Sequence, residues 1–218
     1  RPIECIPYGV DLDTFHPSRR EAGRARLGVR EDEAVILFSA DTAAERRKGF
    51  TELRAALEMA RAALDASKIS AAVRLAVLGH ADPATLPEGA VATGHLSSRT
   101  ALAEVVAASD LYVLPSLEDN LPNGVLEALS CGTPCVGFDV GGVPDMLAQS
   151  DGCELAPVGD ACALGAAIAR SVRNLAALRE RRAAIRSNAE RRYHPRLQAL
   201  GYLALYQASR ESSSRSVM

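Results

Sequence analysis

The segment Leu114-Pro-Ser-Leu-Glu-Asp-Asn-Leu-Pro-Asn-Gly-Val-Leu-Glu-Ala-Leu-Ser-Cys-Gly-Thr-Pro-Cys-Val136 joins two apolar runs through a polar loop and a short helical pattern. It predicts a strand over 111–114, a helix over 124–130 that ends at Gly132, and a strand over 135–138. A strand, a helix and a second strand in this order form a right-handed crossover, which makes the two strands parallel. The segment therefore indicates an α/β fold.

Short apolar runs and helical patterns alternate along the rest of the chain as well. Strands are predicted over residues 3–7, 34–40, 73–78, 90–93 and 153–155, and helices over 49–66, 97–109, 143–148, 160–173, onward to about 189, and 195–209. This alternation is typical of a Rossmann-like parallel sheet with helices on both faces. Because ligands of such sheets bind beyond the carboxyl ends of the strands, a site is expected in the loops that follow them.

The composition narrows the range of functions. The 218 residues are 48% hydrophobic and carry a net charge of −2, which gives no reason to expect nucleic acid or an anionic membrane as a partner. No apolar stretch approaches the roughly 20 residues that cross a bilayer. The five cysteines include no Cys-x-x-Cys pair, the four histidines lack metal-ligand spacing, and no leader is visible. We expect a cytoplasmic protein with no transmembrane segment and no metal site.

The chain divides into one domain and a C-terminal extension. Residues 1–190 are expected to form the domain and residues 191–210 a helix, because leucines and a tyrosine recur there. Residues 211–218 are small and polar, so they predict a disordered tail. Since the chain starts with arginine rather than methionine, we expect it to be a piece of a longer protein.

A basic stretch, Arg46-Arg47-Lys48-Gly49, follows the predicted strand 34–40 and begins a helix. Its side chains and the free N–H groups of the helix start would bind a diphosphate, and each charge-assisted hydrogen bond would contribute about 1.5–3 kcal/mol. A solvated run of charges is the alternative interpretation. The stretch is not a P-loop, because the chain contains no Gly-x-x-x-x-Gly-Lys-Ser/Thr pattern.

Two carboxylates, Asp119 and Glu127, flank the start of the helix predicted over 124–130. Backbone N–H groups at a helix start attract phosphate, whereas carboxylates accept hydrogen bonds from hydroxyls. The pair therefore favours a nucleotide or a sugar, with one carboxylate on sugar hydroxyls and the other on a ribose diol. The alternative makes Asp119 a turn former and Glu127 a surface residue. Apolar neighbours predict that Glu127 is half-buried, where a carboxylate needs partners.

Five stretches carry a family resemblance. They are Ile6-Pro-Tyr-Gly-Val-Asp-Leu-Asp-Thr-Phe-His-Pro17, Arg47-Lys-Gly-Phe50, Ala107-Ala-Ser-Asp-Leu-Tyr-Val-Leu-Pro-Ser116, Leu126-Glu-Ala-Leu-Ser-Cys-Gly-Thr-Pro-Cys-Val136 and Val140-Gly-Gly-Val-Pro-Asp145. In residues, order and spacing they resemble the landmarks of the retaining group 1 (family 4) glycosyltransferases, which have the GT-B fold. The resemblance covers residues 3 to about 207.

The resemblance implies that the chain is the C-terminal, donor-binding half of a two-domain enzyme. Such enzymes bind the acceptor on an N-terminal Rossmann-like domain, which is missing here, and react in the cleft between the domains. They move a sugar, a hexose in the common case, from a nucleotide diphosphate sugar such as a UDP sugar, with retention and without a metal or another cofactor. The helix from Pro195 resembles the one that crosses to the first domain, so its apolar face would be exposed or paired with a second copy of the chain.

The resemblance also assigns roles around the helix start. The family's Glu-x7-Glu pair falls on Asp119 and Glu127, so Asp119 would bind hydroxyls of the donor sugar and Glu127 those of the ribose. Backbone N–H groups would meet the sugar and the phosphates, namely those of Leu121, Asn123, Gly124 and Val125. Pro122 has no N–H, so one contact common in the family is lost or replaced.

Lys48 matches the family's phosphate-binding lysine. The family's arginine, five residues earlier, would fall on Ala43, so Arg47 or Arg46 stands in for it. Lys48, Arg47 and Asp119 are thus the expected catalytic residues, and no protein nucleophile is assigned. The base pocket would be edged by Gly94, His95 and Leu96.

Two classes of function stay open on the sequence. In the first, the chain binds a nucleotide diphosphate sugar for a glycosyltransferase and is inactive without the acceptor domain. In the second, it is a stand-alone module that binds nucleotide sugars without catalysis. An epimerase with the same fold is disfavoured, because the carboxylate and histidine set that such enzymes need is not evident.

Overall fold

The computed structural model describes residues 3–67 and 72–215, and the strands of these residues form one parallel sheet. In chain order the strands are β1 (Ala34–Thr42), β2 (Val73–His80), β3 (Val91–Gly94), β4 (Leu111–Leu114), β5 (Cys135–Phe138) and β6 (Glu154–Ala156). Their order across the sheet is β3-β2-β1-β4-β5-β6, and every neighbouring pair is parallel. The Rossmann-like sheet expected from the sequence is therefore confirmed.

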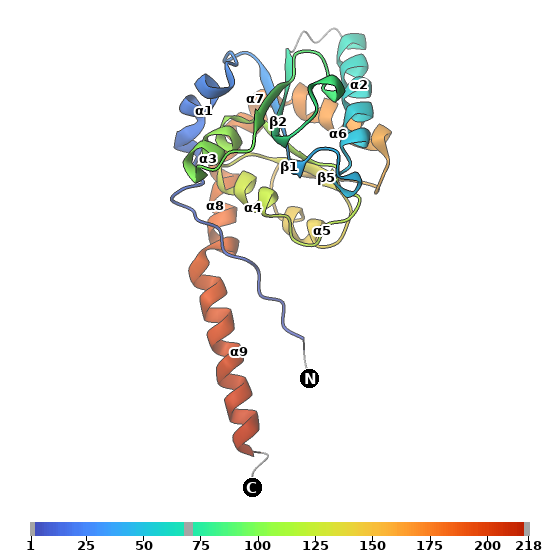
Figure 1. Cartoon of the computed structure of the whole chain (residues 1–218). Coiled ribbons are helices and arrows are strands. Elements are labelled where there is room, and N and C mark those ends of the chain that lie inside the picture. Colours follow the sequence, from blue (N-terminus) through green and yellow to red (C-terminus); the bar gives the residue numbers. More distant parts are fainter. Residues whose placement is uncertain (1–2, 68–71, 216–218) are drawn as a thin grey trace.

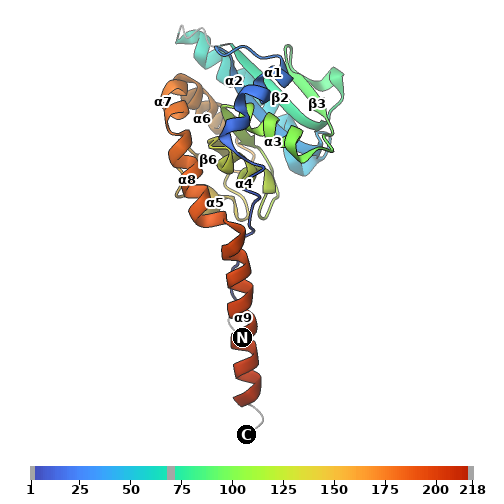
Figure 2. The same cartoon turned by 90° about the vertical axis from the view of Figure 1, so that its left-hand side faces the viewer.

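Helices cover both faces of this sheet (Figures 1 and 2). They are α1 (Arg20–Leu27), α2 (Phe50–Ala66), α3 (Arg99–Ala108), α4 (Asn123–Ser130), α5 (Val143–Leu147), α6 (Ala161–Arg173), α7 (Leu175–Glu180), α8 (Arg182–Tyr193) and α9 (Pro195–Arg215), with single turns of 3-10 helix at Pro17–Arg19, Arg46–Lys48 and Pro83–Thr85. Helices α2 and α6 pack on one face, and α1, α3, α4 and α8 on the other.

The apolar run of β1 explains the two cores. Side chains alternate across a strand, so Val35 and Leu37 point to the face with α4, while Ile36 and Phe38 point to the face with α2. All four are buried. A central parallel strand buried on both faces needs a continuous apolar run rather than an alternating one, and β1 has such a run.

Most of the predicted elements are present within a few residues of their expected bounds, and two predictions within residues 1–190 need correction. Residues 3–7 form no strand: they run as coil, and the fully exposed Ile3 finds no neighbouring strand. The charged helix expected after 173 is divided, because α7 ends at Glu180 and α8 starts at Arg182. The strand prediction for residues 3–7 failed because a strand needs a partner for its backbone groups, and a local sequence pattern cannot show whether a partner is in reach.

The N-terminal segment and α9 run side by side at the end of the domain (Figure 1). The Val10 N–H donates to the carbonyl of Tyr193 at 2.9 Å, and the Gly9 N–H donates to Oε1 of Gln198 at 3.0 Å. Beyond these contacts α9 projects away from the sheet, as both views show (Figures 1 and 2). Its exposed apolar side chains are Leu197, Leu200, Tyr202, Leu203, Leu205 and Tyr206.

The C-terminal helix is longer than the sequence predicted. We expected it to end near 209 and residues 211–218 to be disordered, whereas α9 is helical as far as Arg215. No glycine or proline interrupts the chain between 202 and 215, so nothing there stops the helix. The last three residues of the predicted tail lie outside the described residues. None of the helices within the described ranges is both long and apolar enough to cross a membrane.

Candidate functional site

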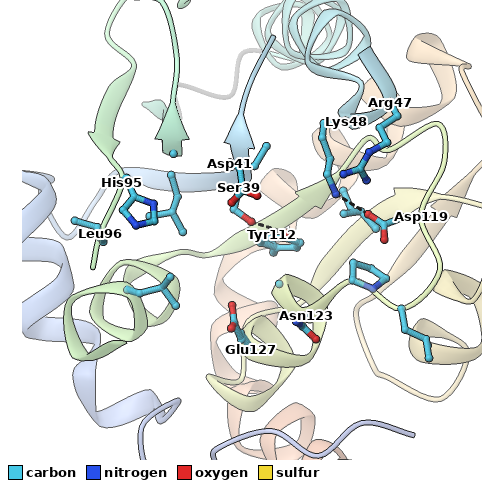
Figure 3. A pocket seen from close by; sticks show the side chains of 18 residues that line it. Ser39, Asp41, Arg47, Lys48, His95, Leu96, Tyr112, Asp119, Asn123 and Glu127 are labelled. Atoms are coloured by element: carbon cyan, nitrogen blue, oxygen red, sulfur yellow. Dashed lines mark hydrogen bonds and ion pairs between the residues drawn. The ribbon is translucent and has the colours of Figure 1, made fainter. Parts of the chain in front are cut away.

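A polar cavity of about 450 Å³ lies beyond the carboxyl ends of β1, β2, β3 and β4 (Figure 3). The helix after β1 covers one face of the sheet and the helix after β4 covers the other, so the loops of these neighbouring strands separate and leave a crevice. Most of the residues that the sequence assigned to the site line this cavity. They are Arg47, Lys48, His95, Leu96, Asp119, Leu121, Asn123, Gly124 and Glu127.

At one end of the cavity the loop after β1 meets the loop after β4. Nζ of Lys48 lies 2.8 Å from Oδ2 of Asp119, and the two side chains are only 18% and 13% exposed. The backbones of the two loops are joined as well, since the Leu117 N–H donates to the carbonyl of Arg47 at 2.8 Å. Two residues that sequence reasoning assigned to phosphate and to sugar hydroxyls are thus an ion pair.

Glycine at position 49 allows this close approach. Its φ is +68°, and a Cβ placed there would lie 1.7 Å from the carbonyl oxygen of Pro115. A larger residue would force apart the two backbones that hold Lys48 and Asp119. The neighbouring Arg47 also lines the cavity, and its Nε donates to Oε1 of Glu45 at 2.6 Å.

The wall of the cavity next to this end is the first turn of α4. Among the described residues no side chain caps the start of α4, and Asn123 and Gly124 of its first turn line the cavity. Gly124 packs on the phenol of Tyr112, whose Oη is 2.8 Å from Oγ of Ser39. Burial raises the pKa of Tyr112, which keeps this phenol neutral. The hydroxyl groups of Tyr112 and Ser39 are thus uncharged hydrogen-bonding groups next to the N-terminus of α4, and this arrangement suits an anion.

Replacing Gly124 with alanine is expected to destabilise the chain by about 1–3 kcal/mol, because the new Cβ would lie 2.3 Å from Oη of Tyr112. Helix propensity alone predicts the opposite sign, a gain of up to about 1 kcal/mol. Urea unfolding of the Gly124→Ala variant decides between the two. In a Tyr112→Phe background the loss should shrink, since the contacting oxygen is gone; an equal loss in both backgrounds would refute the packing argument.

Glu127 lies between the two ends of the cavity, as the close view shows (Figure 3). Burial raises the pKa of its carboxyl to about 7, and the charge of Arg99 opposes this shift. Its carboxylate forms no hydrogen bond or ion pair with the residues that the structure describes. A largely buried acid without protein partners is suited to accept hydrogen bonds from a ligand.

The end of the cavity opposite Lys48 is formed by the loop after β3 (Figure 3). His95 and Leu96 face the cavity there together with Leu102, and the ring of His95 stacks on that of His80 with centroids 6.2 Å apart. A flat, partly apolar surface of this kind suits a nucleobase. Gly94, with a φ of +65°, forms the turn but does not line the cavity.

Val125 is the second predicted site residue that does not reach the cavity. Its side chain is fully buried in the core, and its N–H donates to the carbonyl of Pro122 at 3.1 Å. The sequence also missed cavity residues, namely Ser39, Asp41 and Tyr112. Ser39 and Asp41 lie near the carboxyl end of β1, where the rule for ligands of parallel sheets would have indicated them.

A parallel sheet with helices on both faces and a polar cavity at its carboxyl edge defines the class of Rossmann-like α/β domains. Residues 33–174 match the model of the family "Glycosyl transferases group 1". The chain therefore belongs to the group 1 glycosyltransferase family.

Curated relatives support this assignment. The D-inositol 3-phosphate glycosyltransferase of Segniliparus rotundus is 33% identical over an alignment of 160 residues, and the match covers 67% of this chain and 34% of that protein. The protein of the same name from Mycobacterium tuberculosis is 35% identical over an alignment of 164 residues, and the match covers 69% of this chain and 31% of that protein. The chain thus spans about a third of the length of these relatives.

Solved structures of GT-B glycosyltransferases share the fold. Sucrose-phosphate synthase from Thermosynechococcus elongatus superposes with a TM-score of 0.77 at 24% identity. The superposed region covers 96% of this chain and 53% of the synthase chain. The Anabaena protein HepE in complex with UDP and glucose superposes with a TM-score of 0.70 at 20% identity, over 94% of this chain and 56% of that one. The described fold therefore corresponds to about half of a GT-B enzyme.

Proposed function

We propose that the chain binds a nucleotide diphosphate sugar and serves as the C-terminal donor domain of a retaining glycosyltransferase. The observation that carries this proposal is the order of groups along one cavity. A cation and a helix start lie at one end, a carboxylate lies in the middle, and a flat surface lies at the other end. Within the part of the chain that the structure describes, no side chain caps that helix start and no group pairs with that carboxylate. Phosphates, ribose and base occur in this order in a nucleotide.

The chemistry follows from where charge develops. When the bond between the sugar and the phosphate breaks, negative charge builds up on the diphosphate. Lys48, Arg47 and the N–H groups at the start of α4 border the place where that charge would lie, so they would stabilise the leaving group without a metal ion. Asp119 would hold hydroxyls of the departing sugar, a hexose in this proposal.

The relatives support the nature of the donor. HepE was solved with UDP, with UDP and glucose, and with UDP-glucose. By analogy, UDP sugars are the first donors to test, and GDP sugars the second. Because the curated relatives are about three times as long as the matched region, we propose that an acceptor-binding domain supplies the other wall of the reaction cleft. We place the complete protein in the cytoplasm, where nucleotide sugars are made.

The exposed apolar side chains of α9 fit this proposal. An apolar stripe along a projecting helix indicates a contact surface, and the N-terminal segment that lies beside α9 would enter the same contact. The acceptor-binding domain is the partner that we propose for it. A second copy of the chain is the alternative partner, and light scattering over a series of protein concentrations would detect such a homodimer.

Titration calorimetry with UDP-glucose, UDP, GDP-mannose and GDP tests the proposal. We expect at least one nucleotide sugar to bind, and Lys48→Ala to weaken that binding about tenfold or more, because a charge-assisted hydrogen bond is lost. The exposed Arg54 provides a control, since Arg54→Ala removes a nearby positive charge that does not line this cavity. Failure of all four nucleotides to bind would refute the proposal.

Activity separates the two classes of function. The 218-residue chain is expected to transfer no sugar by itself, because we propose that the acceptor binds to a separate domain. Sugar transfer after addition of an acceptor-binding domain would favour the transferase. Tight binding with no transfer in that assembly would favour a module that only recognises nucleotide sugars.

A further inference from the structure

The ion pair between Lys48 and Asp119 lies where the proposed ligand has its phosphates and its sugar. The two side chains line the cavity, are mostly buried and approach to 2.8 Å. A charge in such a place is poorly solvated, so neither group can give up its partner without gaining another. Any ligand that binds Lys48 must therefore also offer something to Asp119.

The loops that hold the two residues cannot simply separate. The Leu117 N–H donates to the carbonyl of Arg47, and the Gly142 N–H donates to the carbonyl of Asn120, each at 2.8 Å. A Cβ on Gly141 would lie 1.9 Å from the carbonyl oxygen of Asp119, so the backbone of Asp119 is packed against the loop after β5. Only the side chains are free to rearrange.

The chemical needs of the two side chains differ. The ammonium group of Lys48 can donate its hydrogen bonds to another anion in place of the carboxylate, and a phosphate is such an anion. The carboxylate of Asp119 needs hydrogen-bond donors. Besides Lys48, the one side chain within residues 3–67 and 72–215 that donates to it is Ser116, whose Oγ lies 3.4 Å from Oδ2. A sugar offers hydroxyl donors, whereas a bare diphosphate offers no donor and adds like charge.

We propose that the Lys48–Asp119 ion pair makes the site selective for the intact donor over the nucleoside diphosphate that remains after transfer. The inference rests on the proposed function and specifies how that site distinguishes substrate from product. An intact donor satisfies both side chains when the pair opens: its diphosphate binds Lys48 and its sugar hydroxyls bind Asp119. Once the sugar has left, Asp119 faces a diphosphate with no donor, and the pair closes again. Re-formation of the pair then favours release of the nucleoside diphosphate.

The experiment compares UDP-glucose and UDP on the 218-residue chain and on its Asp119→Asn variant, by titration calorimetry. The amide has a similar shape but no charge, so it releases Lys48 and removes the repulsion of a diphosphate. We expect UDP to bind about tenfold more tightly to the variant, and UDP-glucose about fivefold more weakly, because its hydroxyls lose a charged acceptor. The preference for the sugar-bearing ligand should thereby be lost.

Two controls separate the ion pair from general electrostatics. Glu118→Gln removes the same charge from the neighbouring residue, which is exposed and does not line the cavity, so both affinities should change less than about twofold. In a Lys48→Ala background, Asp119→Asn should bring only a small gain in UDP affinity, since no lysine remains to be released. A tenfold gain in that background would assign the effect to simple repulsion and overturn the inference.

The outcomes also separate the inference from the proposed function. If UDP-glucose binds the parent chain but Asp119→Asn leaves UDP affinity unchanged or lowers it, the selectivity device is refuted and the donor site stands. If no nucleotide or nucleotide sugar binds the parent chain, the proposed function is refuted and the inference fails with it.

Discussion

The Asp110→Ala variant is expected to lose about 3–5 kcal/mol of folding free energy, the largest loss that we predict for a single side chain. The carboxylate of Asp110 is 1% exposed and is held by three guanidinium groups and one backbone N–H. Oδ1 lies 2.6 Å from Arg20 and 2.9 Å from Arg179, while Oδ2 lies 3.3 Å from Arg24 and accepts a hydrogen bond from the Val35 N–H at 2.9 Å.

The size of the effect comes from what the substitution leaves behind. One carboxylate joins α1, β1, the start of β4 and α7, and its removal leaves three guanidinium groups close together without their shared anion. Arg24 is 4% exposed, and burial already lowers its pKa. Breaking a buried pair from one side costs more than the pair itself contributes, because an unpaired charge stays buried.

The dependence on pH provides a second test. Burial alone would raise the pKa of Asp110, but its hydrogen bond with Arg179 and the charge of Arg20 hold the pKa below the ordinary value of 3.8. A lowered pKa in the folded state means that the contribution is fully present above pH 3.8 and is lost as the pH falls through the lowered value. The difference in the free energy of unfolding between the parent chain and the Asp110→Ala variant should therefore become smaller only in strong acid.

Urea unfolding at neutral pH measures the loss, and Asp32→Ala is the matched control. Asp32 also pairs with an arginine, Arg30, but both side chains are mostly exposed, so little change is expected. If Asp110→Ala does not fold, Asp110→Asn provides a milder change whose stability can be measured. Equal midpoints for the parent chain and an Asp110 variant would contradict the argument.

Local patterns in the sequence were sufficient for most of the sheet. The apolar run of β1 and the strand–helix–strand segment from Leu114 to Val136 predict buried parallel strands, and right-handed crossovers restrict their order. The strand predicted over 3–7 failed for a non-local reason, since β3 and β6 are the edges of the sheet and the N-terminal segment reaches neither. A strand is a property of two segments, whereas the pattern describes one.

The site shows the same division. Loops after parallel strands predict the positions of Lys48, His95 and Glu127, because the fold brings those loops to one edge. The pairing of Lys48 with Asp119 was beyond the sequence, because 71 positions separate the two residues and neither has a local signal for the other. The network around Asp110 was missed for the same reason, because Arg20, Arg24 and Arg179 lie 90, 86 and 69 positions from it in the sequence.

Two further arginines, on α8, cap the ends of other helices. Arg182 donates to the carbonyl of Ser109 at 2.9 Å and to that of Cys131 at 3.0 Å, and Arg186 donates to the carbonyl of Ser130 at 2.6 Å. Carbonyl groups at the ends of α3 and α4 have no partners inside their helices, so a guanidinium group is a suitable cap. A planar guanidinium group holds five donors in a fixed fork and so reaches carbonyls of two helix ends at once, whereas the ammonium group of lysine has three donors at a single point.

Glu127→Gln is expected to change stability and binding in opposite directions. Folding raises the pKa of Glu127 from 4.5 to about 7, mainly through burial. An acid whose pKa is raised by folding destabilises the folded state in its ionised form, so this penalty is absent below pH 4.5 and fully present above about pH 7. Neutral glutamine avoids it, and the variant should be more stable by about 1–3 kcal/mol at pH 8 and about equal to the parent chain at pH 4.5.

Binding should show the reverse. If Glu127 accepts hydrogen bonds from a ribose diol, removing its charge weakens the binding of UDP-glucose by about 1.5–3 kcal/mol at pH 8. This corresponds to a loss of affinity of roughly tenfold to a hundredfold. The parent chain should bind UDP-glucose more tightly as the pH rises from 6 to 8, because the carboxylate becomes the dominant form. UDP-glucose has no phosphate monoester, so its own charge does not change in this interval.

Thermal unfolding and titration calorimetry at pH 5, 6, 7 and 8 measure both effects on the same samples. Glu58→Gln, an exposed glutamate on α2, is the matched control and should change neither quantity. If Glu127 only supported the fold, its substitution would make the protein less stable. If Glu127 is kept for a ligand, its buried charge makes the parent chain less stable than the variant. Lower stability together with unchanged affinity would therefore remove Glu127 from the site and leave the cavity without its ribose contact.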